Sequence, residues 1–342
     1  MCFYASNTVQ KLIIIMIDRL SAGLDWDSIK LRITSPSFNN VGLFMALIAM
    51  GAYFSTQSPY YLSVRNFLNI GNAVAIRGTV AAGLTMVMIS GGLDISIAAT
   101  MAATGMVTAS LSAAGFPEVV TILLGVLSGC VIGAVNGFFV TRLRINPIIT
   151  TLATMSAIRG LGYVISGGKS VHPSVADFGF MGRGAILGLP APLFWFALVV
   201  IIVFLVLRFT ILGHYCYAIG SNPDACRVSG VRVDMWRMWL YVICGATAAL
   251  GGIMLFAMSA TAKPTAAMGA ELDILTAIIL GGISLSGGTG GIVGTVLGLL
   301  ILGNMRNGMI LMNVAPYWQV VLRGIVLMFA VALDSIRTGG YK

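Results

Sequence analysis

The sequence predicts an all-α, polytopic transmembrane helix bundle. Of its 342 residues, 58% are hydrophobic and only 9% are charged, and its mean hydropathy is +0.96. Charged residues make up about a quarter of an ordinary soluble domain. The apolar residues are gathered into runs long enough to cross a bilayer. A membrane β-barrel would instead have strands of about ten residues with alternating polarity, and the sequence has no such alternation.

Ten apolar segments of roughly 17 to 25 residues are predicted to cross the membrane. Two of them, 271–286 and 289–306, are short and interrupted by glycines, so they form either two tilted helices or one broken element. The count of spans is therefore about ten. The other eight segments are 41–58, 67–90, 93–114, 118–140, 147–166, 192–210, 238–259 and 317–334.

Lys and Arg in the short connections predict that the N and C termini are both cytoplasmic. With the N-terminus inside, the cytoplasmic side receives twelve basic residues and the opposite side five, and short loops rich in these residues stay in the cytoplasm. Residues 1–40 are then a cytoplasmic lead-in, and residues 41–342 form the membrane domain. This distribution accounts for the net charge of +9 without nucleic acid as a partner.

Glycines recur at every fourth residue in two places. On a helix this spacing makes a smooth stripe against which a second helix backbone can pack closely. We therefore expect both series to be helix-packing surfaces. The first series is Gly125, Gly129, Gly133 and Gly137, and the second is Gly282, Ser286, Gly290, Gly294 and Gly298.

Two nine-residue segments are weakly alike. Residues 88–96 read Met-Ile-Ser-Gly-Gly-Leu-Asp-Ile-Ser, and residues 278–286 read Ile-Ile-Leu-Gly-Gly-Ile-Ser-Leu-Ser. Each segment places a Gly-Gly break and a hydroxyl at the junction of two spans. Interrupted helices in corresponding halves of a membrane protein indicate a transport path, so the likeness favours a duplicated core.

A polar stretch, residues 211–237, separates two long apolar runs and is predicted to be a cytoplasmic docking surface. Asn222 is a candidate N-cap with Pro223 in the first turn, and Gly230 is a candidate C-cap. These signals predict a short helix over about 223–229. It would present Asp224, Ala225 and Arg227 to a soluble partner.

The residues give no indication of an enzyme. The only two histidines, His172 and His214, have no cysteine or carboxylate at a metal-ligand spacing, so no metal site is predicted. Gly168-Lys169-Ser170 resembles the end of a phosphate-binding loop, but Tyr163 occupies the place of the required first glycine. We therefore expect no catalytic residues, and if ATP is used another polypeptide binds it.

A charged side chain within a span costs about 2 to 3 kcal/mol to insert, so each one calls for a reason. Six ionisable residues are the candidates, namely Arg77, Asp94, Arg159, Glu271, Asp273 and Arg323. Arg77, Arg159 and Arg323 are interpreted as paired within the bundle or extended toward the membrane surface. The three carboxylates adjoin glycines or hydroxyls, where backbone could line a cavity. Carboxylates and amides bind the hydroxyls of a polar substrate, although the same carboxylates could form a proton relay. The candidate substrate-path residues are Asp94, Ser96, Asn136, Glu271, Asp273 and Asn304.

Four motifs follow one another between about residues 65 and 335. They are Gly91-Gly-Leu-Asp-Ile-Ser96; Asn136-Gly137 with Arg144-Ile-Asn-Pro-Ile-Ile-Thr-Thr-Leu-Ala-Thr154 and Arg159-Gly160; Ala218-Ile-Gly-Ser-Asn222 through Ala225 to Gly230-Val231; and Glu271-Leu-Asp273 with Leu280-Gly-Gly-Ile-Ser-Leu-Ser-Gly-Gly288 and Gly294-Thr295. In order and spacing they resemble the permease subunits of bacterial ATP-binding-cassette importers for monosaccharides, such as ribose, arabinose, xylose and galactose.

The resemblance implies an inner-membrane subunit that works with several partners. A second permease copy or paralogue would complete the path, cytoplasmic ATP-binding subunits would hold ATP and Mg, and a periplasmic binding protein would deliver the sugar. This chain would bind no cofactor and would be surrounded by membrane lipid. The family's coupling loop corresponds to part of 211–237, with Gly213, Ala218, Ile219, Gly220, Asn222, Asp224, Ala225, Arg227 and Gly230 as its candidate residues.

Three alternatives remain open from the residues. The same machinery could import another small polyol or a furanose signal. A proton-coupled secondary transporter would use Asp94, Glu271 or Asp273 as its proton carrier. A membrane scaffold without transport would explain the docking surface but not the carboxylates within the spans.

Overall fold

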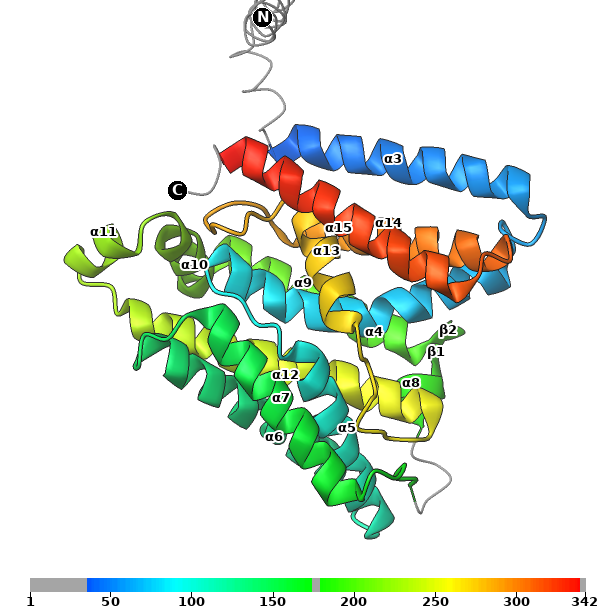
Figure 1. The fold of residues 1–342 in the computed structure, drawn as a ribbon, viewed down its shortest axis with the longest axis horizontal. Coiled ribbons are helices and arrows are strands. Elements are labelled where there is room, and N and C mark those ends of the chain that lie inside the picture. Colours follow the sequence, from blue (N-terminus) through cyan, green and yellow to red (C-terminus); the bar gives the residue numbers. More distant parts are fainter. Residues whose placement is uncertain (1–35, 174–178, 339–342) are drawn as a thin grey trace, which may run out of the picture.

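The computed structural model describes residues 36–338 except 174–178, so most of the predicted lead-in 1–40 lies outside the described residues (Figure 1). Helices account for nearly all of the secondary structure. The elements are α3 (Pro36–Gln57), α4 (Val64–Ile89), α5 (Ile97–Ala113), α6 (Glu118–Thr141), α7 (Pro147–Ser166), α8 (Phe180–Arg183), β1 (Ala185–Ile186), β2 (Leu189–Pro190), α9 (Ala191–Phe209), α10 (Ile211–Ser221), α11 (Pro223–Val228), α12 (Val233–Ser259), α13 (Ala270–Leu280), α14 (Ile292–Leu311) and α15 (Pro316–Thr338).

The all-α polytopic bundle is confirmed. Each of the ten predicted segments contains one helix. Among the described residues, seven helices are long and apolar enough to cross a membrane, namely α4, α6, α7, α9, α12, α14 and α15. Helix α13 has 11 residues and is about 16 Å long, too short to cross a bilayer alone.

Two faces of the bundle are defined by contacts between segments distant in sequence. Asn40 of α3 and Asp334 of α15 line the same cavity as Tyr217 of α10, so both ends of the described chain lie on the face of α10. On another face, Val171 pairs with Ala262 in an isolated antiparallel bridge. The connection after α7 and the one after α12 therefore meet.

Helices α4 and α12 form the centre of the bundle. In their most apolar 18-residue windows, 83% and 72% of the residues are buried, against 22% for α6, 17% for α7 and α9, and 6% for α15. The outer helices carry many exposed large apolar side chains, which suit lipid or another membrane subunit. The central helices therefore provide the protein-filled interior in which polar side chains and irregular backbone can lie.

The first glycine stripe packs as predicted. A Cβ atom added at Gly129 or Gly133 would overlap the carbonyl oxygens of Gly245 and Tyr241, both on α12. Gly125 lies against Thr108 of α5, and Gly137 lies against Met238 of α12. The absence of side chains on this face lets α6 approach the backbone of α12 closely.

The second series is not a continuous helical stripe, and this part of the prediction is wrong. Gly282 and Gly290 lie in the loop between α13 and α14, with φ values of 89° and 94°. A left-handed backbone cannot continue an α-helix, so the four-residue spacing there has no helical meaning. Only Gly294 and Gly298 belong to α14, where they pack against the carbonyl oxygens of Gly281 and Ala277.

Candidate functional site

Two loops interrupt the helical core. They overlap the two similar segments, residues 88–96 and 278–286, at aligned positions. The first break comprises residues 90–96, between α4 and α5, and the second break comprises residues 281–291, between α13 and α14. In the first, Asp94 Oδ1 accepts a hydrogen bond from the Ser96 N–H at 2.8 Å. In the second, Ser284 Oγ accepts one from the Ser286 N–H at 3.1 Å. The same side-chain turn at aligned positions supports the predicted duplication.

The first break is held by a buried polar network. Asp94 is 2% exposed, and besides the backbone bond its Oδ1 accepts the Ser96 hydroxyl at 2.6 Å. Asn136 of α6 donates from Nδ2 to Ser96 Oγ at 2.8 Å and to Asp94 Oδ2 at 3.3 Å. The Tyr241 hydroxyl of α12 accepts from the Leu93 N–H at 3.3 Å and donates to the Leu93 carbonyl at 3.1 Å. Several helices therefore fix this backbone.

Two further side chains hold the ends of the first break. Arg237 of α12 donates from Nε and Nη2 to the Ser90 carbonyl oxygen, at 3.2 and 2.8 Å. Thr151 of α7 accepts from the Ile95 N–H at 3.2 Å. The backbone groups freed by the end of α4 thereby find partners inside the protein, as a broken membrane helix requires.

The second break relies more on glycine and on a distant carboxylate. Asp334 of α15 accepts from the Leu285 N–H at 3.1 Å and from the Ser284 hydroxyl at 3.4 Å. This break also lines a cavity of about 810 Å³, together with residues of α3, α9, α10, α14 and α15. It is therefore less enclosed than the first break. Four of its glycines have positive φ, namely Gly282, Gly287, Gly288 and Gly290.

Helix α10 lies against both breaks. Gly220 packs so closely on the Ile89 carbonyl oxygen and the Gly288 nitrogen that a Cβ atom there would overlap both. The Gly288 N–H of the second break donates to the carbonyl of Ile89, the last residue of α4 just before the first break, at 2.8 Å. The Tyr217 hydroxyl of α10 donates to the Gly290 carbonyl at 3.0 Å. One surface helix thus contacts both interruptions of the core.

The predicted docking surface, residues 211–237, consists of α10, α11 and the first turn of α12. As predicted, Asn222 caps α11, its Oδ1 accepting from the Ala225 N–H at 2.9 Å. Helix α11 ends one residue earlier than predicted, its C-cap is Ser229, and Gly230 follows with a φ of 82°. The polar stretch also ends sooner than predicted, because α12 begins at Val233. Asp234 and Arg237 are therefore helical residues of α12.

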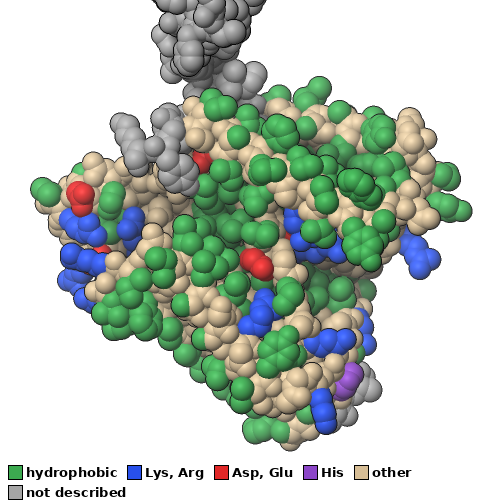
Figure 2. All heavy atoms as spheres, viewed as in Figure 1, with side chains coloured by type: hydrophobic (Ala, Val, Ile, Leu, Met, Phe, Trp, Pro, Cys, Tyr) green, Lys and Arg blue, Asp and Glu red, His purple; other side chains and the backbone are tan. Residues whose placement is uncertain are grey.

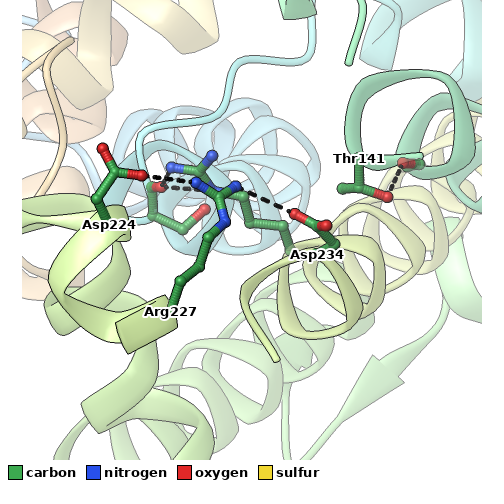
Figure 3. Close-up of polar contacts among 7 residues, drawn as sticks. Thr141, Asp224, Arg227 and Asp234 are labelled. Atoms are coloured by element: carbon green, nitrogen blue, oxygen red, sulfur yellow. Dashed lines mark hydrogen bonds and ion pairs between the residues drawn. The ribbon is translucent and has the colours of Figure 1, made fainter. Parts of the chain in front are cut away.

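Charged side chains gather at the end of the molecule formed by α10 and α11, at the left of Figure 2. Arg227 donates to Asp224 Oδ1 at 2.9 Å and to Asp234 Oδ1 at 3.3 Å, so it links α11 to α12 (Figure 3). The hydrogen bond that Arg227 donates to Asp234 is the main reason that the pKa of Arg227 is raised, with a further contribution from the bond to Asp224. Arg227 is therefore charged at every physiological pH.

The candidate coupling residues divide into an outward and an inward set. Ile219 is fully buried and packs with Cys226 and Val233, which joins α10, α11 and α12 into one small core. Gly213 is also buried, against Leu207 of α9, and Gly220 faces the breaks. The remaining members are exposed on the surface, namely Ala218, Asn222, Asp224, Ala225, Arg227 and Gly230.

The candidate path residues lie in separate places. Asp94, Ser96 and Asn136 come together at the first break, as described above. Asp273 of α13 instead pairs with Arg323 at 2.6 Å and with Arg77 at 3.7 Å. These two arginines are paired within the bundle, as predicted.

The other path candidates also have defined surroundings. Asn304 of α14 accepts the Tyr61 hydroxyl at 2.6 Å. Glu271 differs from the rest, because its Oε2 is buried without a hydrogen-bond partner among the described residues. Arg159 donates to the Pro264 carbonyl at 3.3 Å, so this arginine contacts the backbone rather than a carboxylate.

Sequence reasoning missed four residues that hold the breaks. Asp334 is a carboxylate at the end of a predicted span, so the rule that singled out Asp94 and Asp273 would have found it. Arg237 lies within the predicted polar stretch, but nothing in its spacing relates it to Ser90. Tyr241 carries no pattern, because a tyrosine in an apolar run is usual, and nothing in the spacing of Tyr217 within the polar stretch relates it to Gly290. Their roles depend on contacts between distant segments.

The comparisons with known proteins agree with this arrangement. The family described as "Branched-chain amino acid transport system / permease component" matches residues 66–331. The ribose import permease protein RbsC of Escherichia coli (strain K12) is 37% identical over 295 residues, which are 85% of this chain and 92% of that protein. RbsC of Bacillus subtilis (strain 168) is 38% identical over 296 residues, which are 86% and 92% of the two chains.

A third relative carries a different sugar in its name. The L-arabinose ABC transporter permease protein AraH of Azospirillum brasilense is 34% identical over 300 residues, which are 87% of this chain and 88% of that protein. No solved structure matches the chain. The chain is a multi-pass inner-membrane permease and belongs to the family of branched-chain amino acid transport system permease components.

Proposed function

We propose that this chain is the permease subunit of an ATP-binding-cassette importer and that it moves a monosaccharide across the inner membrane. The observation that carries the proposal is the position of Gly220, because one exposed surface helix contacts both breaks of the core. A partner that displaces α10 would act where the two breaks meet. The ribose and L-arabinose relatives support a sugar as the substrate class.

The proposal includes a set of partners and a topology. Separate cytoplasmic subunits bind ATP and Mg and press on α10 and α11, a second permease copy or paralogue completes the path, and a periplasmic protein delivers the sugar. The chain passes the membrane ten times with both termini in the cytoplasm. The meeting of α3, α10 and α15 at one cavity supports this topology, because it puts both ends on the side of the docking surface.

Glu271 is the best-placed of the path candidates to bind the sugar. Asp94 and Asp273 already have partners, whereas Glu271 Oε2 is a buried acceptor with none among the described residues. A sugar hydroxyl would satisfy it as a donor. Glu271→Gln keeps the shape and removes the charge. We expect this substitution to reduce uptake about tenfold, because one charge-assisted hydrogen bond to the sugar is lost.

Reconstitution tests the proposal. The chain would be incorporated into proteoliposomes with its ATP-binding subunit and binding protein, and uptake of radiolabelled ribose, arabinose, xylose and galactose would be followed with and without ATP. The proposal predicts uptake of at least one of these sugars only with ATP. Uptake driven by a proton gradient without the ATP-binding subunit would refute it.

A further inference from the structure

A second pocket opens beside the docking surface. It has a volume of about 260 Å³ and lies between the turn joining α6 to α7 and the junction of α11 with α12. Three arginines line it, Arg144 from the turn, Arg227 from α11 and Arg237 from α12, with Asp234 as the only carboxylate among its lining residues. Two segments far apart in the sequence thus meet around a basic pocket.

Two of the three arginines have no carboxylate partner. Arg227 is shared between Asp224 and Asp234. Among the described residues, neither Arg144 nor Arg237 has a carboxylate oxygen within 4.0 Å. Arg237 is part-buried, and its Nε and Nη2 groups donate to a neutral carbonyl. Asp234, the carboxylate of this pocket, is bonded to Arg227, and a part-buried guanidinium with no carboxylate within bonding distance favours an anion at the pocket.

The backbone of the turn presents Arg144 in an unusual conformation. Arg144 has a φ of 57°, a left-handed value that residues other than glycine rarely adopt. Such a conformation persists only where the surrounding structure holds it, and it is common in ligand-binding segments. The neighbouring Asn146 caps α7, its Oδ1 accepting from the Ile148 N–H at 2.9 Å, and this fixes the far side of the turn.

The surroundings of the pocket favour a protein as the source of the anion. Val228, next to Arg227 on α11, is 91% exposed, and Leu143 beside Arg144 is 52% exposed. Ile145, which lines the pocket, is 38% exposed. Exposed aliphatic side chains around a charged centre on a cytoplasmic loop are typical of a surface covered by another polypeptide. A small soluble anion would leave them uncovered.

The pocket is connected to the core through a single side chain. Arg237 lines the pocket and also bonds the Ser90 carbonyl, the first residue of the first break. A carboxylate bound in the pocket would hold the Arg237 guanidinium in place, and with it the Ser90 carbonyl that this guanidinium bonds. Occupancy of the pocket is thereby linked to the first break, independently of the contact through Gly220.

We propose that this pocket binds an acidic side chain of the cytoplasmic ATP-binding subunit, as a second contact beside α10 and α11. The inference rests on the proposed function. It identifies the chemistry of one contact, a carboxylate held by Arg144 and Arg237. It also assigns Arg237 as the positioning residue between that contact and the first break.

Charge reversal at the pocket tests the inference. Purified Arg144→Glu in nanodiscs would be titrated with the purified ATP-binding subunit of the same importer, and the affinity would be measured by biolayer interferometry at several salt concentrations. We expect affinity about 30-fold weaker than that of the natural chain, because a desolvated charge pair is replaced by repulsion. The matched control is Arg142→Glu, exposed in the same turn but outside the pocket, for which we expect a change of less than about threefold.

Each other outcome has a defined meaning. If the natural chain does not bind the ATP-binding subunit at all, the proposed function fails. If the natural chain binds and both variants weaken binding equally, the pocket is not a contact and this inference alone fails. If Arg144→Glu lowers the retention of phosphatidylglycerol by the purified chain but leaves subunit affinity unchanged, the pocket is a lipid site and the inference is overturned. A photo-crosslinker at position 144 should label an acidic segment of the subunit.

Discussion

The two breaks share a sequence pattern and a local turn, but they are held in different ways. In the first break the carboxylate, Asp94, belongs to the loop itself and is bonded by Ser96 and Asn136. In the second break Ser284 occupies the aligned position, and the carboxylate comes from Asp334 on α15. The second break also has four glycines with positive φ and borders the large cavity.

This difference indicates that one break is rigid and that the other can change its conformation. A loop fixed by buried hydrogen bonds from three helices behaves as a rigid support, because moving it would expose unpaired polar groups in a low-dielectric interior. A glycine-rich loop beside a cavity can change its dihedral angles at lower cost. We infer that the first break is an anchor and that the second break is the part that moves when α10 is displaced.

The largest effect is expected where α10 contacts both breaks. Gly220→Ala places a methyl group against the Ile89 carbonyl and the Gly288 nitrogen, and neither backbone can yield as a flexible side chain would. We expect ATP-driven uptake to fall about 100-fold, which corresponds to roughly 3 kcal/mol, within the range for a badly overpacked site. Uptake would be measured in proteoliposomes.

The control for this substitution lies in the second break. At Gly291 the nearest atom to an added Cβ is the Tyr217 hydroxyl at 3.7 Å, an ordinary contact, and its φ of −175° suits any residue. Gly291→Ala should therefore keep nearly full uptake. Equal losses in the two variants would show that α10 has no special relation to the breaks.

The second largest effect is a loss of stability, and it should differ between the carboxylates of the two breaks, Asp94 and Asp334. In the natural chain the Ser96 hydroxyl and the Asn136 amide donate to the Asp94 carboxylate. Asp94→Asn would place an N–H₂ group against one of these donors, so we expect the unfolding free energy to fall by about 2 kcal/mol. Asp334→Asn should cost about half as much, because Asp334 is only part-buried. Thermal unfolding in detergent would measure both. A larger loss of stability for Asp334→Asn would reverse the assignment of anchor and moving part.

Arg237→Lys tests how the anchor is connected to the docking surface. Lysine keeps the positive charge but cannot direct two fixed N–H groups at the Ser90 carbonyl. We expect the ATP-binding subunit to remain bound while sugar-stimulated ATP hydrolysis falls about tenfold, a change of about 1.4 kcal/mol. If stimulation is unchanged, Arg237 has only a structural role.

The smallest effect is expected at the contact of α10 with the second break. Tyr217→Phe removes the hydroxyl that donates to the Gly290 carbonyl and leaves the ring in place. The loss of one neutral hydrogen bond is worth about 1 kcal/mol, so uptake should change by about fivefold or less. A complete loss of uptake would mean that the second break is held as tightly as the first.

The sequence predicted the helices well and the contacts between them poorly. Apolar runs identified all seven helices of the described residues that are long enough to cross a membrane, and Asn222 with Pro223 identified α11, because both signals are local. The first glycine stripe was correctly interpreted because Gly125 to Gly137 lie within one helix. The prediction from the second series was wrong because the four-residue spacing continued through a loop, where helical periodicity has no meaning.

The composition of the candidate site was only partly predictable. Asp94, Ser96 and Asn136 were each singled out, yet nothing in the sequence indicated that they bond one another. Asp273 was a path candidate, and its partners Arg77 and Arg323 come from helices far away in the chain. Such pairings are set by tertiary packing, which a single sequence without co-varying relatives does not reveal.

Hydrogen exchange of the assembled importer tests the central claim most directly. Mass spectrometry would follow residues 90–96 and 281–291 with the ATP-binding subunit in its nucleotide-free and ATP-bound states. The account predicts that ATP changes the protection of residues 281–291 strongly while residues 90–96 stay protected throughout. A change confined to residues 90–96, or an equal change in both breaks, would contradict it.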